Sequence, residues 1–455
     1  MSKASQKKSK FIAGLDIGTS KITFVIGSVQ GPWAPSNVYE EKIQNAKSVA
    51  SSLRFGAQTA NNNIGSLHDW NINIVGLGSA PSHGIRQGAV VNVEATIESI
   101  RRAREEAELM AGEVVDEVYV SIGGTHIKSF DSKGMVAIRN KEVRTEDVTR
   151  VIEAAKAVVV PADRDVLHVL PREFKLDDQE GIFDPIGMTG VRLEANVHII
   201  TAGRTSLQNA LKCTEKAGLK VKSLVLQQFA SALAVLSEDE KKLGAAVIDI
   251  GGGTSDVILF ANGSVGYTGL VPVGGIQFSQ DISMGLRTPF ANAEVLKKKF
   301  GAAIAEFIDE KEMIEVEGVG GRNPRSILRR ELGQIVEARA EETMLLIYQD
   351  ILSSGLSQQL GSGVVLTGGG ADLEAMVEMG EFVFDMPVRK GLPLKVGGLA
   401  DVVKSPIYAT AVGLLMYGLE KEKMNITPEV ETGMQDLFSG ISSKMKDFFG
   451  ELLKN

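Results

Sequence analysis

Cysteine is almost absent from this sequence, and histidine is sparse. A single cysteine, Cys213, stands among 455 residues, so no disulfide can form within the chain, and this usage fits a reducing cytosol. The five histidines are scattered without the spacing that metal ligation needs, and we interpret each as a packed or surface residue. They are His68, His83, His126, His168 and His198. The sequence therefore predicts neither a disulfide scaffold nor a histidine-based metal centre.

Long apolar runs and an excess of positive charge are also missing. No apolar stretch approaches the roughly 20 residues that span a bilayer. Residues 1–10 are basic but lead into a strand pattern and not into the apolar core of a signal peptide, so we expect a disordered tail. The formal net charge is −8, which argues against nucleic acid as a main partner. With 44% apolar residues, the chain can bury the cores of two or more domains.

Two segments that lie far apart in the chain have nearly the same sequence. Residues 12–21 read I-A-G-L-D-I-G-T-S-K, and residues 246–256 read A-V-I-D-I-G-G-G-T-S-D. Each is an apolar run, an Asp, a glycine turn and a second apolar run, which is typical of a strand, a turn and a strand. A single copy is also compatible with a plain hairpin turn, but two copies point to a duplicated fold.

Glycine turns of this kind expose backbone N–H groups that can bind phosphate oxygens. Two such turns, one from each half of the fold, could close on one polyphosphate from opposite sides. The residues predicted to hold the phosphates are Gly18, Thr19, Ser20 and Lys21 in the first turn and Gly251, Gly252, Gly253 and Thr254 in the second. Asp16 and Asp249 stand at the preceding strand ends, where we expect them to hold a hydrated Mg²⁺ ion.

A third glycine turn follows an apolar strand pattern at residues 363–370, G-V-V-L-T-G-G-G. Two phosphate turns and a late T-G-G-G turn together resemble the actin-like ATPase superfamily, which includes actins, sugar kinases and heat-shock chaperones. The resemblance implies that Gly368, Gly369 and Gly370 contact the nucleoside.

Several further segments resemble one family within that superfamily. They are residues 81–90, P-S-H-G-I-R-Q-G-A-V; 167–174, L-H-V-L-P-R-E-F; 179–193, Q-E-G-I-F-D-P-I-G-M-T-G-V-R-L; 319–326, V-G-G-R-N-P-R-S; and 408–418, Y-A-T-A-V-G-L-L-M-Y-G. With the three turns, they make the chain similar to the FtsA family of actin-like bacterial cell division proteins, from about residue 11 to 420 and again in the C-terminal tail.

This resemblance implies an α/β, duplicated actin-like (ribonuclease H-like) two-domain ATPase fold. It also implies binding of ATP and Mg²⁺, polymerisation of the protein with itself, and attachment of the tubulin-like FtsZ ring to the cytoplasmic face of the cell membrane at the division site. Recruitment of other cell division proteins is a further expectation.

The resemblance also implies a domain layout. The core of domain I is expected at 11–124 and 197–243, and a β-α-β-β subdomain is inserted at 125–196, with a helix capped by Thr145 in the box T-E-D-V. The core of domain II is expected at 244–275 and 336–395, with an outer subdomain at 276–335 and a long helix over 329–353. A closing helix is placed at 396–420. Residues 31–71 depart from the family as an insertion whose role is open.

The C-terminal tail has a pattern of its own. Residues 421–433 are polar and predict a linker, whereas residues 434–454 place apolar side chains at helical spacing. The stripe consists of Met434, Leu437, Phe438, Ile441, Met445, Phe448, Phe449, Leu452 and Leu453. We interpret it as an amphipathic helix that anchors the protein at a membrane surface. A helix docked on the protein's own core is the alternative.

Catalytic and partner residues are less clearly marked. In L-V-L-Q-Q-F at 224–229, Gln227 is in the place where the resemblance implies a residue that positions the attacking water, although an ordinary polar helix residue fits as well. At most a slow ATPase is expected. The basic residues Arg287, Lys297, Lys298 and Lys299 are candidates for binding an acidic FtsZ peptide, and a solvated charged face is the alternative reading.

Two other function classes share the phosphate turns. A sugar or small-molecule kinase would also need a carboxylate base at a substrate hydroxyl, for which the sequence offers no motif. A heat-shock chaperone would carry a large β-rich domain after the ATPase core. A nucleotide-dependent scaffold accounts for both the turns and the tail, and the kinase is kept as the alternative.

Overall fold

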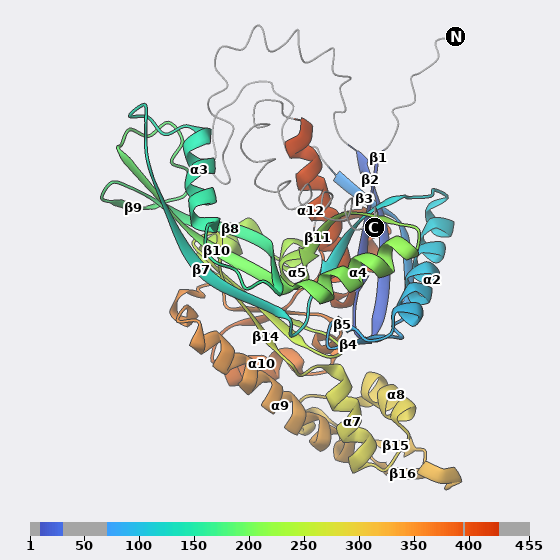
Figure 1. Ribbon diagram of the computed structural model, residues 1–455. Coiled ribbons are helices and arrows are strands. Elements are labelled where there is room, and N and C mark those ends of the chain that lie inside the picture. Colours follow the sequence, from blue (N-terminus) through green and yellow to red (C-terminus); the bar gives the residue numbers. More distant parts are fainter. Residues whose placement is uncertain (1–9, 31–70, 395, 427–455) are drawn as a thin grey trace, which may run out of the picture.

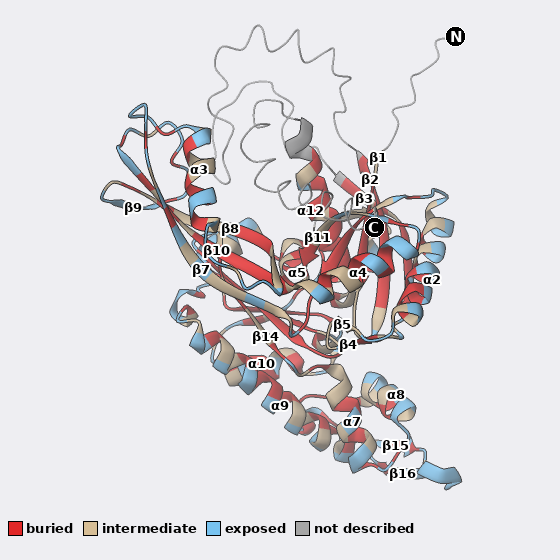
Figure 2. Cartoon of the chain, viewed as in Figure 1, coloured by how far each residue is buried: buried red, intermediate tan, exposed pale blue. Residues whose placement is uncertain are grey.

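A computed structural model of the chain describes residues 10–30, 71–394 and 396–426 (Figure 1). The basic tail, nearly all of the predicted insertion at 31–71 and the predicted anchor at 434–454 lie outside the described residues. Two main sheets and one smaller four-stranded sheet form the framework. In Figure 2 the strands of both main sheets are largely buried.

The first main sheet has the strand order β11-β6-β1-β2-β3-β19. Its strands, in chain order, are β1 (Lys10–Ile17), β2 (Lys21–Gln30), β3 (Asn71–Pro81), β6 (Glu117–Ile122), β11 (Lys220–Leu226) and β19 (Val396–Gly398). β1, β2 and β3 form an antiparallel meander, and β6 pairs with β1 in parallel. β11 then extends the sheet beside β6, also in parallel.

The second main sheet repeats this arrangement in the order β14-β13-β12-β17-β18. Its strands are β12 (Ala245–Ile250), β13 (Ser255–Ala261), β14 (Ser264–Val271), β17 (Val364–Thr367) and β18 (Val388–Lys390). Again three strands form an antiparallel meander, the first of them pairs in parallel with a later strand, and a further parallel strand follows. The predicted duplicated α/β fold is therefore confirmed.

Helices cover the faces of the two sheets. α2 (Val93–Ala111) and α4 (Arg204–Lys216) pack on one face of the first sheet. α2 begins at Asn92, whose Oδ1 accepts from the Ala95 N–H at 3.1 Å. It lies very close to β3, because a Cβ at Gly78 would come within 1.9 Å of the Ala103 carbonyl oxygen.

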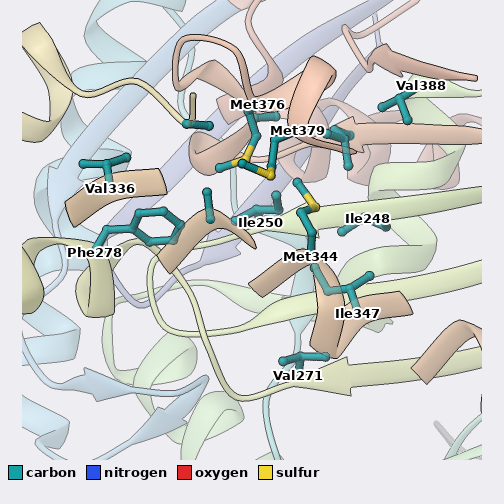
Figure 3. Packing of buried hydrophobic residues seen from close by; sticks show 14 of the residues in the cluster. Ile248, Ile250, Val271, Phe278, Val336, Met344, Ile347, Met376, Met379 and Val388 are labelled. Carbon is teal, nitrogen blue, oxygen red and sulfur yellow. The ribbon is translucent and has the colours of Figure 1, made fainter. Parts of the chain in front are cut away.

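α5 (Gln227–Val235) and α12 (Ala409–Ile426) form the layer between the two sheets. One apolar cluster joins residues of the first sheet such as Val25, residues of the second such as Val247, and both helices. On the far face of the second sheet lie α7 (Gly275–Gly285), α9 (Arg329–Ser353) and α10 (Met376–Phe384). In Figure 3 the side chains of these helices converge on Ile248 and Ile250 of β12.

The remaining elements are short or peripheral. They are β4 (Ile85–Arg86), β5 (Ala89–Val90), α6 (Glu238–Leu243), α8 (Phe290–Phe300), β15 (Met313–Val316), β16 (Arg325–Leu328) and α11 (Ala400–Val403), together with 3₁₀ turns at η2 (Ala305–Phe307), η3 (Val319–Gly321), η4 (Ser357–Gln359), η5 (Gly369–Asp372) and η6 (Pro406–Tyr408). α7, α8, β15 and β16 form the lower end of the molecule in Figure 1, within the predicted outer subdomain. None of the helices in the described residues is long and apolar enough to span a bilayer.

The inserted subdomain is the four-stranded sheet with the order β7-β10-β8-β9. It consists of β7 (Ile127–Ala137), α3 (Thr145–Lys156), β8 (Arg164–Leu176), β9 (Gln179–Ile182) and β10 (Arg192–Gly203). α3 packs on one face of the sheet and closes a separate apolar core. The structure thus shows a β-α-β-β-β unit, one short strand more than predicted.

The predicted capping residue of α3 is wrong. Arg144 is the residue before the helix, and its N–H donates to Asp147 Oδ2 at 3.1 Å, while Thr145 is the first helical residue. The box T-E-D-V therefore caps the helix through its carboxylate and not through its hydroxyl.

Two histidines connect the inserted subdomain to the main sheets. His198 of β10 contacts Thr268 Oγ1 of β14 through Nε2 at 3.0 Å and Asp131 Oδ1 through Nδ1 at 2.7 Å. His168 of β8 accepts from the Leu226 N–H at 2.9 Å, at the end of β11. Burial, and secondarily the charge of Lys421, lower the pKa of His168 to about 3. The neutral imidazole is thus the form that the fold holds.

The predicted linker at 421–433 begins too early. α12 continues to Ile426, and Glu422 is buried in it. The Glu422 carboxylate accepts from Lys222 Nζ at 2.8 Å and also pairs with Lys10 at the start of β1. A buried carboxylate needs such partners, so this turn of helix belongs to the folded core.

The neutral state of His168 makes stability depend on pH. Because its folded pKa of about 3 lies below the ordinary value, the unfolded chain binds the proton more readily. The stabilisation is fully present above about pH 6.5 and is lost as the pH falls towards 3. We expect this group to lower the free energy of unfolding by up to about 1.4 kcal/mol per pH unit, and His168→Gln to remove that contribution. Denaturant unfolding between pH 7 and pH 4 measures how the free energy of unfolding changes with pH in the wild type and in His168→Gln. Equal slopes in the two proteins would contradict the assignment.

Candidate nucleotide site

The two predicted phosphate turns lie against each other where the main sheets meet. A Cβ added at Gly252 would lie 1.9 Å from Ser20 Oγ, and one at Gly253 would lie 3.0 Å from Thr19 Cγ2. Each turn is closed by its own hydrogen bond, from Gly18 N to Lys21 O at 3.1 Å and from Gly251 N to Thr254 O at 2.9 Å. The structure therefore brings together residues that the sequence only predicted to be partners.

Asp16 and Asp249 occupy equivalent places in the two halves. Asp16 is buried, and its Oδ1 accepts from Ser121 Oγ at 2.8 Å. Burial raises the pKa of Asp16 to about 6, the Ser121 hydrogen bond acts against this shift, and the nearby Asp249 carboxylate adds to it. Asp249 accepts from Ser231 Oγ at 2.6 Å and from Thr410 Oγ1 at 3.2 Å, and burial raises its pKa as well.

A third buried carboxyl group stands beside them. Asp256 is paired directly opposite Asp249 across β12 and β13. Thr254 Oγ1 donates to one of its oxygens at 3.0 Å, and the other oxygen is buried with no hydrogen-bond partner among the described residues. Burial first, and then the charge of Asp249, raise the pKa of Asp256 to about 8. A pKa of about 8 keeps Asp256 mostly protonated at neutral pH, so this carboxyl group adds little to the attraction for a cation.

Lys21 supplies the positive charge of the site. Its Nζ is buried and makes no hydrogen bond in the described part of the chain. Burial lowers the pKa of Lys21 to about 8, while Asp16 and Asp249 act in the opposite direction. A buried ammonium without hydrogen bonds is costly unless a ligand completes its partners. This orphaned donor, next to turns that only glycine permits, fits a phosphate group.

The third glycine turn lies directly beside the second. Gly368 has φ 80°, and a Cβ there would lie 2.3 Å from Asp249 Oδ1, so glycine is required on both grounds. A Cβ at Gly370 would lie 2.2 Å from Ile250 Cγ2. The Gly368 N–H donates to Pro406 O at 3.1 Å. Gly369 faces Ile407, whose Cγ2 would be 3.7 Å from an added Cβ.

Gln227 lies between the two halves of the site. It is the first residue of α5, and a Cβ at Gly123 would lie 2.5 Å from its Oε1. Its side-chain amide also acts to lower the pKa of the Asp249 carboxyl. The side chain is therefore directed to the carboxylates and is not a solvent-facing helix residue.

The four basic residues predicted to bind a partner differ in their surroundings. Lys297 Nζ donates to Gly275 O at 2.7 Å and pairs with Glu294 at 2.7 Å, and its side chain is largely buried. Gly275 in turn donates to Gly251 O at 2.9 Å, so Lys297 supports the second turn. Arg287, Lys298 and Lys299 remain exposed.

Other residues of the site were missed from the sequence. They are Ser121, Ser231 and Thr410, whose hydroxyls hold the carboxylates, and Tyr408, whose ring contacts Lys21. Isolated hydroxyls in strands and helices leave no motif. For Lys297, which supports the second turn, the only available sequence signal was its spacing from Glu294, which places both residues on one helix face.

Comparisons with known proteins give one consistent family. The family model "SHS2 domain inserted in FTSA" matches residues 124–201, and "Cell division protein FtsA" matches residues 246–413. Cell division protein FtsA of Pseudomonas aeruginosa is 42% identical over 427 residues, covering 94% of each chain. The Escherichia coli K12 protein of that name is 37% identical over 438 residues, covering 95% of each. The match at 124–201 includes the inserted subdomain predicted at 125–196.

Solved structures share the fold at low identity. A chain of the solved structure titled "PilM-PilN type IV pilus biogenesis complex" aligns with a TM-score of 0.57 at 15% identity, over 90% of this chain and 98% of that one. MreB5 of Spiroplasma citri, solved with ADP, aligns with a TM-score of 0.50 at 12% identity, over 92% and 99%. These likenesses establish the actin-like architecture.

The close approach of the two turns predicts that Gly252 tolerates no side chain. Gly252→Val would push Cβ and both methyl groups into Ser20 and into the space that phosphates would need, so we expect ATP binding to be lost. Gly203→Ala is the matched control, because an added Cβ there meets only ordinary contacts, the nearest at 3.5 Å. Calorimetric titration with Mg–ATP measures both variants. Native affinity in Gly252→Val would contradict the assignment of the second turn.

Proposed function

The chain belongs to the FtsA family of cell division proteins, and on that premise we propose that it is an ATP-binding scaffold of the division site. In this proposal it polymerises with copies of itself on the cytoplasmic face of the cell membrane, links FtsZ to that membrane and helps to recruit later division proteins. The observation that supports the nucleotide function most directly is the meeting of two glycine turns beside the buried, unpaired Lys21 ammonium.

ATP is the ligand that best fits these groups. Backbone N–H groups of both turns and the Lys21 ammonium would hold the phosphates, and Gly368 to Gly370 would lie beside the nucleoside. MreB5 of Spiroplasma citri, which shares the fold, was solved with ADP, and this supports a nucleotide as the ligand. Since the two turns come from different sheets, one bound triphosphate would tie both domains together.

Magnesium would be held by Asp16 and Asp249 through water. Their carboxylates project from equivalent strand ends, and burial raises the pKa of each carboxyl. Carboxylates and water are the ligands that Mg²⁺ prefers beside phosphates. Bound Mg²⁺ would neutralise part of the phosphate charge, and Ser121, Ser231 and Thr410 would keep the carboxylates in place.

Hydrolysis, if it occurs, would be slow. The Gln227 amide lies between the turns and can orient a water molecule, but an amide does not take up the proton that the water must lose. The kinase alternative is not favoured, because the relatives at 37–42% identity are cell division proteins. The nucleotide would therefore serve mainly to order the two domains for assembly.

The outer subdomain offers a basic surface for FtsZ. Lys298 is 70% exposed in its side chain and pairs with Glu294 at 3.0 Å, and Lys299 is exposed next to it. Arg287 is also exposed but has φ 48°, so its replacement would disturb the backbone as well as the charge. Lys297 is excluded from this surface because it supports the second turn.

Reversal of the charges of Lys298 and Lys299 tests the proposed FtsZ surface. We expect Lys298→Glu with Lys299→Glu to weaken recruitment of FtsZ by roughly tenfold, since like charges would then face an acidic peptide, while ATP is still bound. Lys212→Glu with Lys242→Glu changes the same charge at two other exposed positions and should leave recruitment intact. Co-sedimentation of FtsZ with lipid-bound protein gives the result. Equal recruitment by both double variants would place the FtsZ contact elsewhere.

Membrane attachment is assigned to the tail pattern at 434–454. α12 ends the described core at Ile426, and the tail follows it in the sequence. Burying a large apolar side chain contributes roughly 1.5–3 kcal/mol, but an interfacial helix immerses one face and must also be ordered. A single tail should therefore bind lipid reversibly, and a polymer that presents many tails should bind far more firmly.

Charges placed in the apolar stripe should release the protein from lipid. Phe448→Glu with Phe449→Glu is expected to abolish co-sedimentation with vesicles while ATP binding is retained, because carboxylates cannot enter the acyl region. Ser439→Asp with Ser443→Asp adds the same charge on the opposite face of the predicted helix and should leave most of the binding. If the phenylalanine variant pellets as the wild type does, the tail is not the anchor and the docked-helix alternative is correct.

A further inference from the structure

One short segment contacts all three glycine turns or their carboxylates. Residues 405–410 lead from the second domain into α12. Pro406 O accepts from the Gly368 N–H of the third turn at 3.1 Å, and Thr410 Oγ1 donates to Asp249 Oδ2 at 3.2 Å. Between these contacts, the Tyr408 ring faces Lys21 of the first turn. The hydrogen bonds of Pro406 and Thr410 fix the backbone on both sides of Tyr408.

The Lys21 ammonium makes a cation–π contact with Tyr408. Lys21 Nζ lies 4.0 Å from the centroid of the Tyr408 ring, and it has no hydrogen-bond partner among the described residues. The lowered pKa of about 8 still leaves the amine mostly protonated at neutral pH. A buried cation over an aromatic face is attracted by the ring quadrupole, and the attraction is stronger when water is excluded.

The ring matters because the ammonium has competing neighbours. Asp16 and Asp249 both attract Lys21 electrostatically, and both are the carboxylates that would hold Mg²⁺. A lysine has a flexible stem and a compact charge, so without a fixed partner it could swing onto these carboxylates. An ion pair of that kind would withdraw the lysine from the phosphates and would occupy the oxygens that Mg²⁺ needs.

We propose that Tyr408 is a positioning residue whose ring holds the Lys21 ammonium in place beside the glycine turns, so that the phosphates of ATP meet a cation that is already oriented. The proposal rests on the nucleotide function proposed above and adds a residue from the opposite end of the sequence to it. The hydroxyl group of Tyr408 has no part in this role. Preorganisation of a binding group raises affinity because less order is lost when the ligand arrives.

The test compares the ring with an apolar side chain that lacks it. Tyr408→Phe keeps an aromatic face, and we expect its dissociation constant for Mg–ATP to stay within about twofold of the wild type. Tyr408→Leu keeps apolar packing but loses the face, and we expect binding weaker by about three- to tenfold. Titration with a fluorescent ATP analogue measures the constants, and thermal unfolding of each variant without nucleotide checks that the fold persists.

A double-mutant cycle separates the proposed role from a merely structural one. Lys21→Met removes the ammonium at nearly constant length, so Tyr408→Leu should then change the ATP affinity by less than about twofold. An equal loss from Tyr408→Leu in both backgrounds would overturn the proposal, because the effect would not pass through Lys21. A loss in Tyr408→Phe as large as in Tyr408→Leu would overturn it too, because the hydroxyl would then be responsible.

The experiment distinguishes a failure of the proposed nucleotide function from a failure of the proposed role of Tyr408. If the wild-type chain does not bind Mg–ATP, the proposed nucleotide function is wrong, and the cycle cannot begin. If the wild type binds and Lys21→Met weakens binding, but Tyr408→Leu does not, the nucleotide function stands and the positioning role of Tyr408 is wrong. The positioning role is supported if Tyr408→Leu weakens ATP binding and Tyr408→Phe does not. It also requires that Tyr408→Leu cause no further loss of affinity in the Lys21→Met background.

Discussion

Three carboxyl groups and one ammonium are buried together where the two main sheets meet, and the rest of the structure depends on this arrangement. Asp16, Asp249 and Asp256 all have a pKa above the ordinary value because burial opposes their charge, and Lys21 has a lowered one. Neither Lys21 Nζ nor one Asp256 oxygen has a hydrogen-bond partner in the described residues. Such a site is incomplete on its own. A bound phosphate chain with its cation would supply the missing partners, so closure of the two domains and occupation of the site would stabilise each other.

The contacts of this site extend outwards along two helices. α12 begins next to Thr410, which hydrogen-bonds Asp249, and ends near Glu422, which pairs with lysines of β1 and β11. α5 begins with Gln227 beside the carboxylates, and the residue before it donates its N–H to His168 of the inserted subdomain. Both helices lie between the sheets in one apolar cluster. The inserted subdomain and the C-terminal end of α12 are thus connected to the candidate nucleotide site by continuous packed structure.

Much of the fold and of the candidate site could be predicted, because it depends on residues that are close together in the sequence. The repeated Asp and glycine turns identified both halves of the site, and α9 has the predicted bounds of Arg329–Ser353. What could not be predicted depends on partners distant in sequence. Its spacing from Glu294 did not distinguish Lys297 from Lys298, since both pair with that residue, and only the fold brings Gly275 to Lys297. The helix at 421–426 looked like a linker because the lysines that neutralise Glu422 lie in β1 and β11. Tyr408 opens the family-like segment 408–418, but its contact with Lys21 could not be predicted, since that partner stands at the other end of the chain.

The central claim is that one polyphosphate spans both turns, and hydrogen–deuterium exchange measures this most directly. Backbone N–H groups that donate to phosphates exchange more slowly with solvent than the same groups in the free protein. The account predicts that saturating Mg–ATP slows exchange at residues 18–21 and 251–254 together, with protection at 368–370 as well. Protection of only one of the two turns, or unchanged exchange at both while ATP is bound, would contradict it.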